Sequence, residues 1–185
     1  LGLALFAANL AAWKDLEDFI GLGQDTYQTV KYSEVPIVAA SAGMCLGGGA
    51  EVLMHCDAVQ AHSESYVGLV EVGVGIIPAW GECKELLGRL NDFGLASKGP
   101  MGPVMKAFEY IGTAQVAKSA EQARSMGFIG PEDRITMNRD RLLADAKARV
   151  MELSEDYEPP EPRNYSLPGP TGMAGLQLAL NDLAL

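Results

Sequence analysis

The stretch CLGGGAEVLMHCD, Cys45–Asp57, places three consecutive glycines directly before a segment of helix-forming composition. Glycine is the least favourable ordinary residue in a helix, so three in succession indicate that another group approaches the backbone closely. A turn of this kind leaves backbone N–H groups exposed at the start of a helix, because no side chain screens them. Such donors can form an oxyanion hole, in which each hydrogen bond contributes about 3 kcal/mol to a developing negative charge.

Two carboxylates accompany these glycines. Glu51 follows the last glycine by two residues, and Glu71 lies in the apolar, glycine-lined stretch GLVEVGVGIIP. Glu51 alone is equally well explained as a favourable charge on the first turn of a helix. A buried Glu71 indicates a stabilising partner or a functional role, because burying an uncompensated carboxylate costs free energy. Two neighbouring carboxylates in an apolar pocket favour acid/base chemistry, because one can hold a proton while the other activates water.

The glycine patterns exclude two common nucleotide sites. Gly73-x-Gly75-x-x-Pro78 lacks the third glycine of a dinucleotide-binding loop. Gly43-x-x-x-x-Gly48 is followed by Gly-Ala, where a phosphate loop needs Lys and then Ser or Thr.

The composition is that of a globular protein with an acidic surface. Of 185 residues, 48% are hydrophobic, and 14 Lys and Arg face 24 Asp and Glu, for a formal charge of −10. This balance argues against nucleic acid as a partner, and no run is long and apolar enough to span a membrane. Three cysteines, without ligand spacing around His55 and Cys56, predict a reducing compartment such as the cytoplasm and no metal site.

The hydrophobic patterns predict an α/β fold. An amphipathic helix from Leu10 to Ile20, a buried strand at Ile37–Ala40 and a helix at Ala50–His55 come first, followed by short β segments and a helix from about Trp80 to Leu90. Beyond Gly99 we expect helices only, including one after Asn138 that buries Leu142, Leu143, Ala146, Val150 and Leu153. A proline-rich extended segment precedes a last helix near Met173–Leu183. The expected divisions are a core at 1–98, a helical region at 99–157 and a tail at 158–185.

These residues also carry a resemblance to a known family. PIVAASAGMCLGGGAEVLMHCD, followed by YVGLVEVGVGIIP, resembles the signature of the crotonase superfamily, the enoyl-CoA hydratases and isomerases. SAEQARSMGFIGPEDRITMNRDRLLADAK and EDYEPPEP resemble the tail of hydratase modules joined to 3-hydroxyacyl-CoA dehydrogenases. The likeness runs from Phe6 onward. It implies the crotonase ββα spiral, and since that family's first strands are absent here, we expect an N-terminally incomplete domain.

The resemblance implies a role for each matching position. Glu51 would activate water, and Glu71 would exchange a proton with the α-carbon of the substrate. Gly48 and Ala8 would supply the two N–H groups of the oxyanion hole, although Ala7 stands where the family normally has glycine. The remaining substrate-binding positions would be Gly47, Gly49, Pro78 and Trp80. The loop after Glu71 departs from the family's small residues at Trp80 and Glu82, and Trp80 either caps the acyl pocket or is a core aromatic.

The implied activity is enoyl-CoA hydration in fatty-acid β-oxidation, acting on an acyl-CoA thioester without a further cofactor. The implied assembly is a homotrimer or a dimer of trimers, with the helical region at 99–157 as its oligomerisation region. A double-bond isomerase of the same fold is an alternative, which the presence of both Glu51 and Glu71 disfavours. A non-catalytic assembly module is another, since the net charge of −10 offers no evident cradle for the CoA phosphates.

Overall fold

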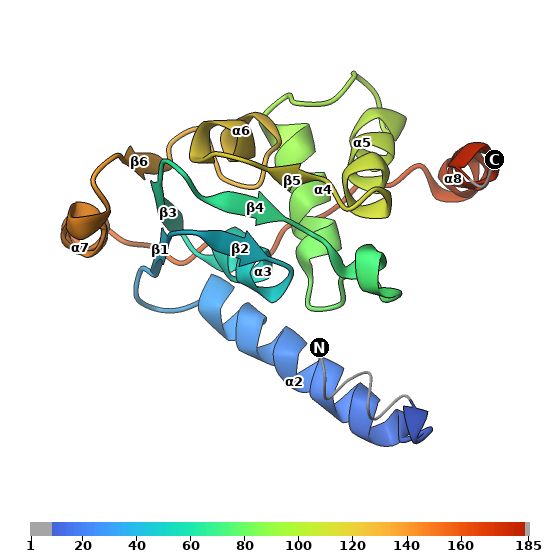
Figure 1. Ribbon diagram of the computed structural model, residues 1–185, viewed down its shortest axis with the longest axis horizontal. Coiled ribbons are helices and arrows are strands. Elements are labelled where there is room, and N and C mark those ends of the chain that lie inside the picture. The colour runs from blue at the N-terminus through green and yellow to red at the C-terminus, as the bar shows by residue number, and fades with distance from the viewer. Residues whose placement is uncertain (1–8, 184–185) are drawn as a thin grey trace.

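The computed structural model describes residues 9–183 and has two small sheets surrounded by helices (Figure 1). The first half contains α2 (Trp13–Lys31), β1 (Val38–Ser41), β2 (Met44–Leu46), α3 (Gly48–His55), β3 (Ala58–His62), β4 (Tyr66–Gly68), the 3₁₀ helix η1 (Glu71–Val74) and α4 (Glu82–Asp92). The second half contains α5 (Met101–Gly112), β5 (Val116–Ala117), α6 (Ala120–Ser125), β6 (Arg134–Thr136), η2 (Arg139–Arg141), α7 (Leu142–Leu153) and α8 (Gly169–Leu183).

Each sheet has three strands. In the first, β3 pairs in parallel with β1 on one side and with β6 on the other. In the second, β4 pairs in parallel with β2 and antiparallel with β5. All five residues of β3 are buried, so this strand is covered on both faces and shows no alternation of polar and apolar residues. The fold class predicted from the sequence, α/β, is confirmed.

The first half repeats a unit in which one strand of each sheet is followed by a helix. The chain passes from β1 in the first sheet to β2 in the second, and α3 then returns it to β3 in the first. α3 contacts β1, β2 and β4, so it lies between the sheets and buries Ala50, Leu53 and Met54 in the common core. The start of α3 is therefore fixed by packing on both sheets.

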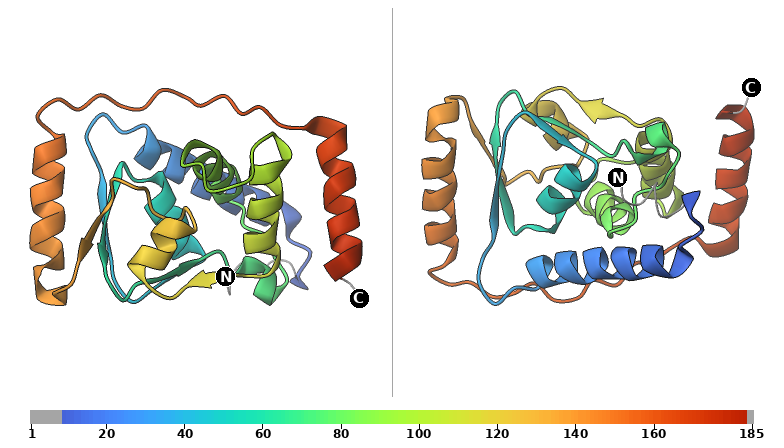
Figure 2. Two further views of the ribbon diagram at one scale, coloured as in Figure 1. Left: turned by 90° about the horizontal axis from the view of Figure 1, so that it is seen from above. Right: turned by 60° about the horizontal axis from the view of Figure 1, so that its bottom comes forward.

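The last two helices flank the body at opposite ends, joined by a long extended segment that crosses it (Figure 2). The proline-rich sequence after Tyr157 is extended, as predicted, because proline lacks an N–H and disfavours a helical residue before it. The Tyr157 hydroxyl donates to Asp57 Oδ1 at 2.8 Å and to the Ser33 carbonyl at 3.3 Å. These two bonds attach the start of the segment to the body.

Four expectations about elements are wrong. The strand expected to be buried at Ile37–Ala40 is β1, in which Val38 and Ala39 are half-buried and Ala40 is exposed. The region after Gly99 is not entirely helical, because β5 and β6 each join one of the sheets. The first amphipathic helix begins at Trp13 and not at Leu10, and it continues past Ile20 to Lys31. On α7, Leu142 and Ala146 are buried, but Leu143 is 75% exposed, since it lies on the side of the helix away from β1 and β3.

Candidate active site

The site begins at Gly47, which turns the chain from β2 into α3. Its φ of 54° and ψ of −124° belong to a backbone conformation that only glycine adopts without strain. Its N–H donates to the Gly68 carbonyl at 2.9 Å, which ties the turn to β4. A Cβ at this position would lie 2.9 Å from Glu71 Oε1. Two features therefore favour glycine at position 47: its dihedral angles and the close approach of the Glu71 carboxylate.

The other two glycines have different surroundings. A Cβ on Gly48 would lie 3.3 Å from Glu51 Oε2, and the Gly48 carbonyl accepts from the Tyr27 hydroxyl at 3.3 Å. As the first residue of α3, Gly48 has an N–H without an intrahelical acceptor. Gly49 is exposed, and a Cβ there would meet only Cys45 Cβ at 3.8 Å. Gly47 and Gly48 are thus constrained by the site, whereas Gly49 is not.

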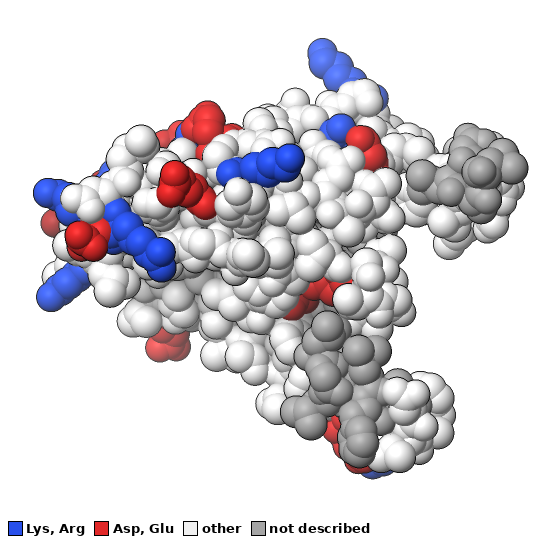
Figure 3. Space-filling view, in the orientation of Figure 1, with Lys and Arg blue, Asp and Glu red and all other residues white. Residues whose placement is uncertain are grey.

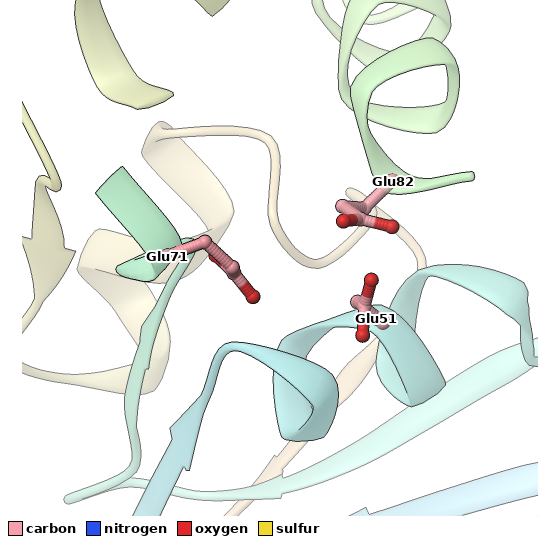
Figure 4. Close-up of side chains that lie close together, drawn as sticks. All are labelled: Glu51, Glu71 and Glu82. Carbon is pink, nitrogen blue, oxygen red and sulfur yellow. The ribbon is translucent and has the colours of Figure 1, made fainter. Parts of the chain in front are cut away.

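Three glutamates from three elements meet beside this turn (Figure 4). Glu51 comes from the first turn of α3, Glu71 from the start of η1 and Glu82 from the start of α4. One carboxylate oxygen of each lies within 4.8 Å of the others. The two glutamates singled out in the sequence therefore lie together, and Glu82 is a third member that the sequence analysis noted only as a departure from the family pattern.

The environment makes it unfavourable for all three to be charged. Burial, together with the negative charge of Glu51, raises the pKa of the half-buried Glu71 carboxyl. Burial, and then its hydrogen bond to Glu51, raise the pKa of Glu82 to about 9. Among residues 9–183, no salt bridge involves any of the three. The site can hold protons at neutral pH as well as accept them.

A cavity of about 980 Å³ opens beside the carboxylates and is lined mostly by apolar side chains. Its size is typical of a small-molecule site. Acidic side chains are visible in the hollow between α2 and the sheets (Figure 3). The lining residues are Leu16, Phe19, Ile20, Leu46, Gly47, Gly48, Glu51, Val70, Glu71, Val72, Val74, Gly75, Ile76, Ile77, Ala79 and Trp80.

Trp80 forms one wall of this cavity and connects it to α2. Its ring lies edge-on to Phe19, with centroids 5.4 Å apart, and 5.6 Å from the ring of Tyr27. Gln24 Nε2 donates to the Ala79 carbonyl at 2.8 Å and holds the preceding residue against the same helix. Trp80 is thus at once a packed aromatic and part of the cavity wall, so the two sequence-based interpretations describe the same position.

The structure separates the predicted site residues into three groups. Gly47, Gly48, Glu51, Glu71 and Trp80 all line the cavity. Gly49 and Pro78 do not, because Gly49 faces β2 and solvent, and Pro78 is buried behind the loop with its carbonyl 3.6 Å from Cys83 Sγ. Ala8, the predicted second donor of the oxyanion hole, and Ala7 lie outside the described residues.

The donor set does not suit a hard divalent cation. Such ions take about six to eight oxygen ligands. Here only three carboxylates meet among the described residues, and apolar side chains surround them. Two of the three already accept a hydrogen bond from the backbone N–H of Trp80. His55 does not face this set, since its ring stacks on Tyr27 at 5.1 Å and its Nδ1 lies 2.8 Å from the Glu51 carbonyl. These contacts agree with the structural role expected for His55.

Known structures define the class of the fold. The enoyl-CoA hydratase of Bacillus anthracis matches with a TM-score of 0.62 at 23% identity, over 77% of this chain and 49% of that one. This likeness identifies the crotonase fold. Residues 10–90 also match the family described as enoyl-CoA hydratase/isomerase. No helix within residues 9–183 combines the length and apolar character needed to cross a membrane.

Relatives match a larger share of the chain than the family model does. The sequence is 42% identical over 167 residues, 88% of this chain, to a Bacillus subtilis protein named "Probable 3-hydroxyacyl-CoA dehydrogenase". It is 40% identical over 81 residues, 44% of this chain, to "Crotonyl-CoA hydratase" of Syntrophomonas wolfei. The matched part spans 20% of the length of the first relative and 31% of the second.

Proposed function

We propose that this chain carries the site of an enoyl-CoA hydratase, which adds water to a trans-2-enoyl-CoA to give a 3-hydroxyacyl-CoA. The observation that carries the proposal is the meeting of Glu51 and Glu71 at the glycine turn, on the wall of an apolar cavity. Relatives named "Crotonyl-CoA hydratase" and "Short-chain-enoyl-CoA hydratase" support the same reaction. The match to "Probable 3-hydroxyacyl-CoA dehydrogenase" supports a place in fatty-acid β-oxidation.

In this mechanism each carboxylate has a separate task. Glu51 takes a proton from water while the oxygen bonds to C3 of the substrate, and protonated Glu71 delivers its proton to C2. The carbon–carbon double bond becomes single, and the elements of one water molecule are added. The raised pKa of Glu71 supports its role as proton donor. A proton must then pass from Glu51 back to Glu71 before the next turnover.

The thioester oxygen would be held by backbone N–H groups as negative charge develops on it. Gly48 supports one such donor, because its N–H begins α3 and its residue lines the cavity. Ala8 is proposed as the second donor from the family resemblance alone. No cofactor takes part, since the charge is handled by these donors and the two carboxylates.

The resemblance also supports a homotrimer, or a dimer of trimers, as the assembled form. A cytoplasmic location is proposed from the three free cysteines. Both proposals concern the whole protein, and size-exclusion chromatography with light scattering tests the first of them directly.

The experiment that tests the proposed reaction is crotonyl-CoA hydration by wild type, Glu51→Gln and Glu71→Gln. We expect the wild type to be active and each variant to lose about 100-fold or more in kcat, the range typical of a lost general acid or base. A trans-3-enoyl-CoA serves as the second substrate. Double-bond migration that survives in Glu51→Gln would instead support an isomerase, and a wild type inert toward both substrates would support an assembly module.

A further inference from the structure

Glu82 is a third buried carboxylate to which the proposed hydration gives no task. Glu82 is the first residue of α4 and is 0% exposed. Its Oε2 accepts a hydrogen bond from the backbone N–H of Trp80 at 3.0 Å. Its other oxygen, Oε1, is buried and accepts no hydrogen bond from any described residue. A charged carboxylate in this state would leave half of its accepting capacity unsatisfied, at a high desolvation cost.

No positive charge from residues 9–183 pairs with Glu82. The titratable groups around it are Glu51 and His55 from α3, Glu71 from η1, Tyr27 from α2, and Cys83 on its own helix. Lys31 of α2 and Lys84 of α4 both pair with Glu85 at 2.7 Å instead. A proton is therefore the simplest means of removing one of the negative charges from the cluster.

Glu51 and Glu82 are coupled through one shared donor. The backbone N–H of Trp80 lies 3.3 Å from Glu51 Oε1 and 3.0 Å from Glu82 Oε2, so both carboxyl groups contact the same backbone nitrogen. Figure 4 shows Glu82, at the start of α4, facing Glu51 on α3. Of the three glutamates Glu82 is the most buried, since Glu51 is 4% exposed and Glu71 is half-buried. Glu82 is thus the best placed to be neutral.

We propose that Glu82 is a protonated carboxylic acid that donates a hydrogen bond to the Glu51 carboxylate and fixes its orientation. Glu82 is then a positioning residue for the group that activates water, a role that rests on the proposed hydratase function. The raised pKa of Glu82, about 9, agrees with a neutral acid at physiological pH. A carboxyl group kept neutral by an apolar site is an effective hydrogen-bond donor.

The kinetic test compares Glu82→Gln, which keeps a neutral donor, with Glu82→Ala, which removes it. We expect kcat for crotonyl-CoA to stay within about threefold in Glu82→Gln and to fall about tenfold or more in Glu82→Ala, with KM little changed in both. The wild-type kcat should decline above about pH 9 as Glu82 loses its proton, and Glu82→Gln should abolish this decline. Exposed Glu132 provides the control variant Glu132→Gln, which should match wild type throughout.

An infrared titration tests the proton independently of any activity. The spectrum of wild type minus Glu82→Gln should contain the C=O band of a protonated carboxyl at pH 7, and this band should disappear near pH 9. If the wild type does not hydrate crotonyl-CoA but the band is present, the proposed function fails and the proton on Glu82 stands. The inference is overturned if the band is absent at pH 7, or if Glu82→Ala keeps full activity. It is also overturned if Mn²⁺ raises the melting temperature of wild type but not that of Glu82→Gln, since a cation would then neutralise the cluster.

Discussion

Gly47 combines a backbone conformation closed to other residues with direct proximity to Glu71 Oε1. We predict that Gly47→Ala lowers the free energy of unfolding by about 2 kcal/mol or more, the cost of a non-glycine residue held in this region. The added methyl group would also push Glu71 away from its position, so the hydration rate should fall as well. Urea denaturation of the purified variant measures the first effect.

Gly49 provides the matched control two residues further along the same run. It has an ordinary helical φ and open surroundings, so Gly49→Ala should leave stability unchanged or raise it by about 0.4–1 kcal/mol. Equal losses in the two variants would contradict the account, because the three glycines would then share one structural reason.

Glu82 predicts a distinct dependence of stability on pH. Its folded-state pKa of about 9 lies above its ordinary value of 4.5, so between these values the folded protein binds a proton that the unfolded chain does not. The stabilisation is therefore complete below pH 4.5 and is lost as pH rises toward 9, with a slope of up to about 1.4 kcal/mol per pH unit. Urea denaturation at several pH values should show a shallower decline for Glu82→Gln. Parallel profiles for the two proteins would refute the assignment.

Some residues of the candidate site could be predicted from the sequence, and others could not. Glu51 and Glu71 could be identified because each is a carboxylate in a glycine-rich or apolar stretch. Glu82 could not be given a role, because its burial depends on α4 turning its first residue toward α3, which no local pattern encodes. Its one signal was an acidic residue in a loop where the family has small ones.

At the scale of elements, α2 and the loop before α4 are joined at Gly23. A Cβ on Gly23 would lie 2.2 Å from Trp80 Nε1, whereas one on Gly21 would have no atom within 4 Å. We predict that Gly23→Ala displaces the Trp80 ring and changes the shape of the cavity. The displacement should appear as altered tryptophan fluorescence in a Trp13→Phe background, where Trp80 is the remaining tryptophan.

Gly21→Ala is the control on the same helix. It should leave the fluorescence unchanged and stabilise α2 by up to about 1 kcal/mol through helix propensity alone. If both variants gave the same spectrum, α2 would not pack against Trp80 as described.

Long elements with a clear periodicity were predicted from the sequence, and some short ones were missed. The helix at α3 and the extended segment after Tyr157 followed from composition and from proline. β5 and β6 were missed because strands of two and three residues carry no period, and they exist only through pairing with β4 and β3.

At the scale of the whole molecule, the net charge of −10 should repel the CoA phosphates. Lys and Arg visible in Figure 3 lie mainly toward α7 and the upper edge, away from the hollow beside α2. We predict that KM for crotonyl-CoA falls when NaCl is raised from about 20 to about 200 mM, because salt screens the repulsion. Crotonyl-pantetheine, which has no phosphates, should show no such change. A KM for crotonyl-CoA that rises with salt would reveal a basic binding surface instead.

The most direct test of the central claim is the kcat for crotonyl-CoA hydration in wild type, the two single variants Glu51→Gln and Glu71→Gln, and the double variant. Carboxylates that act as one unit should give non-additive losses. We predict that the double variant is about as slow as the slower single variant. Losses that multiply, or a single variant that keeps the wild-type rate, would contradict a shared site of acid/base catalysis.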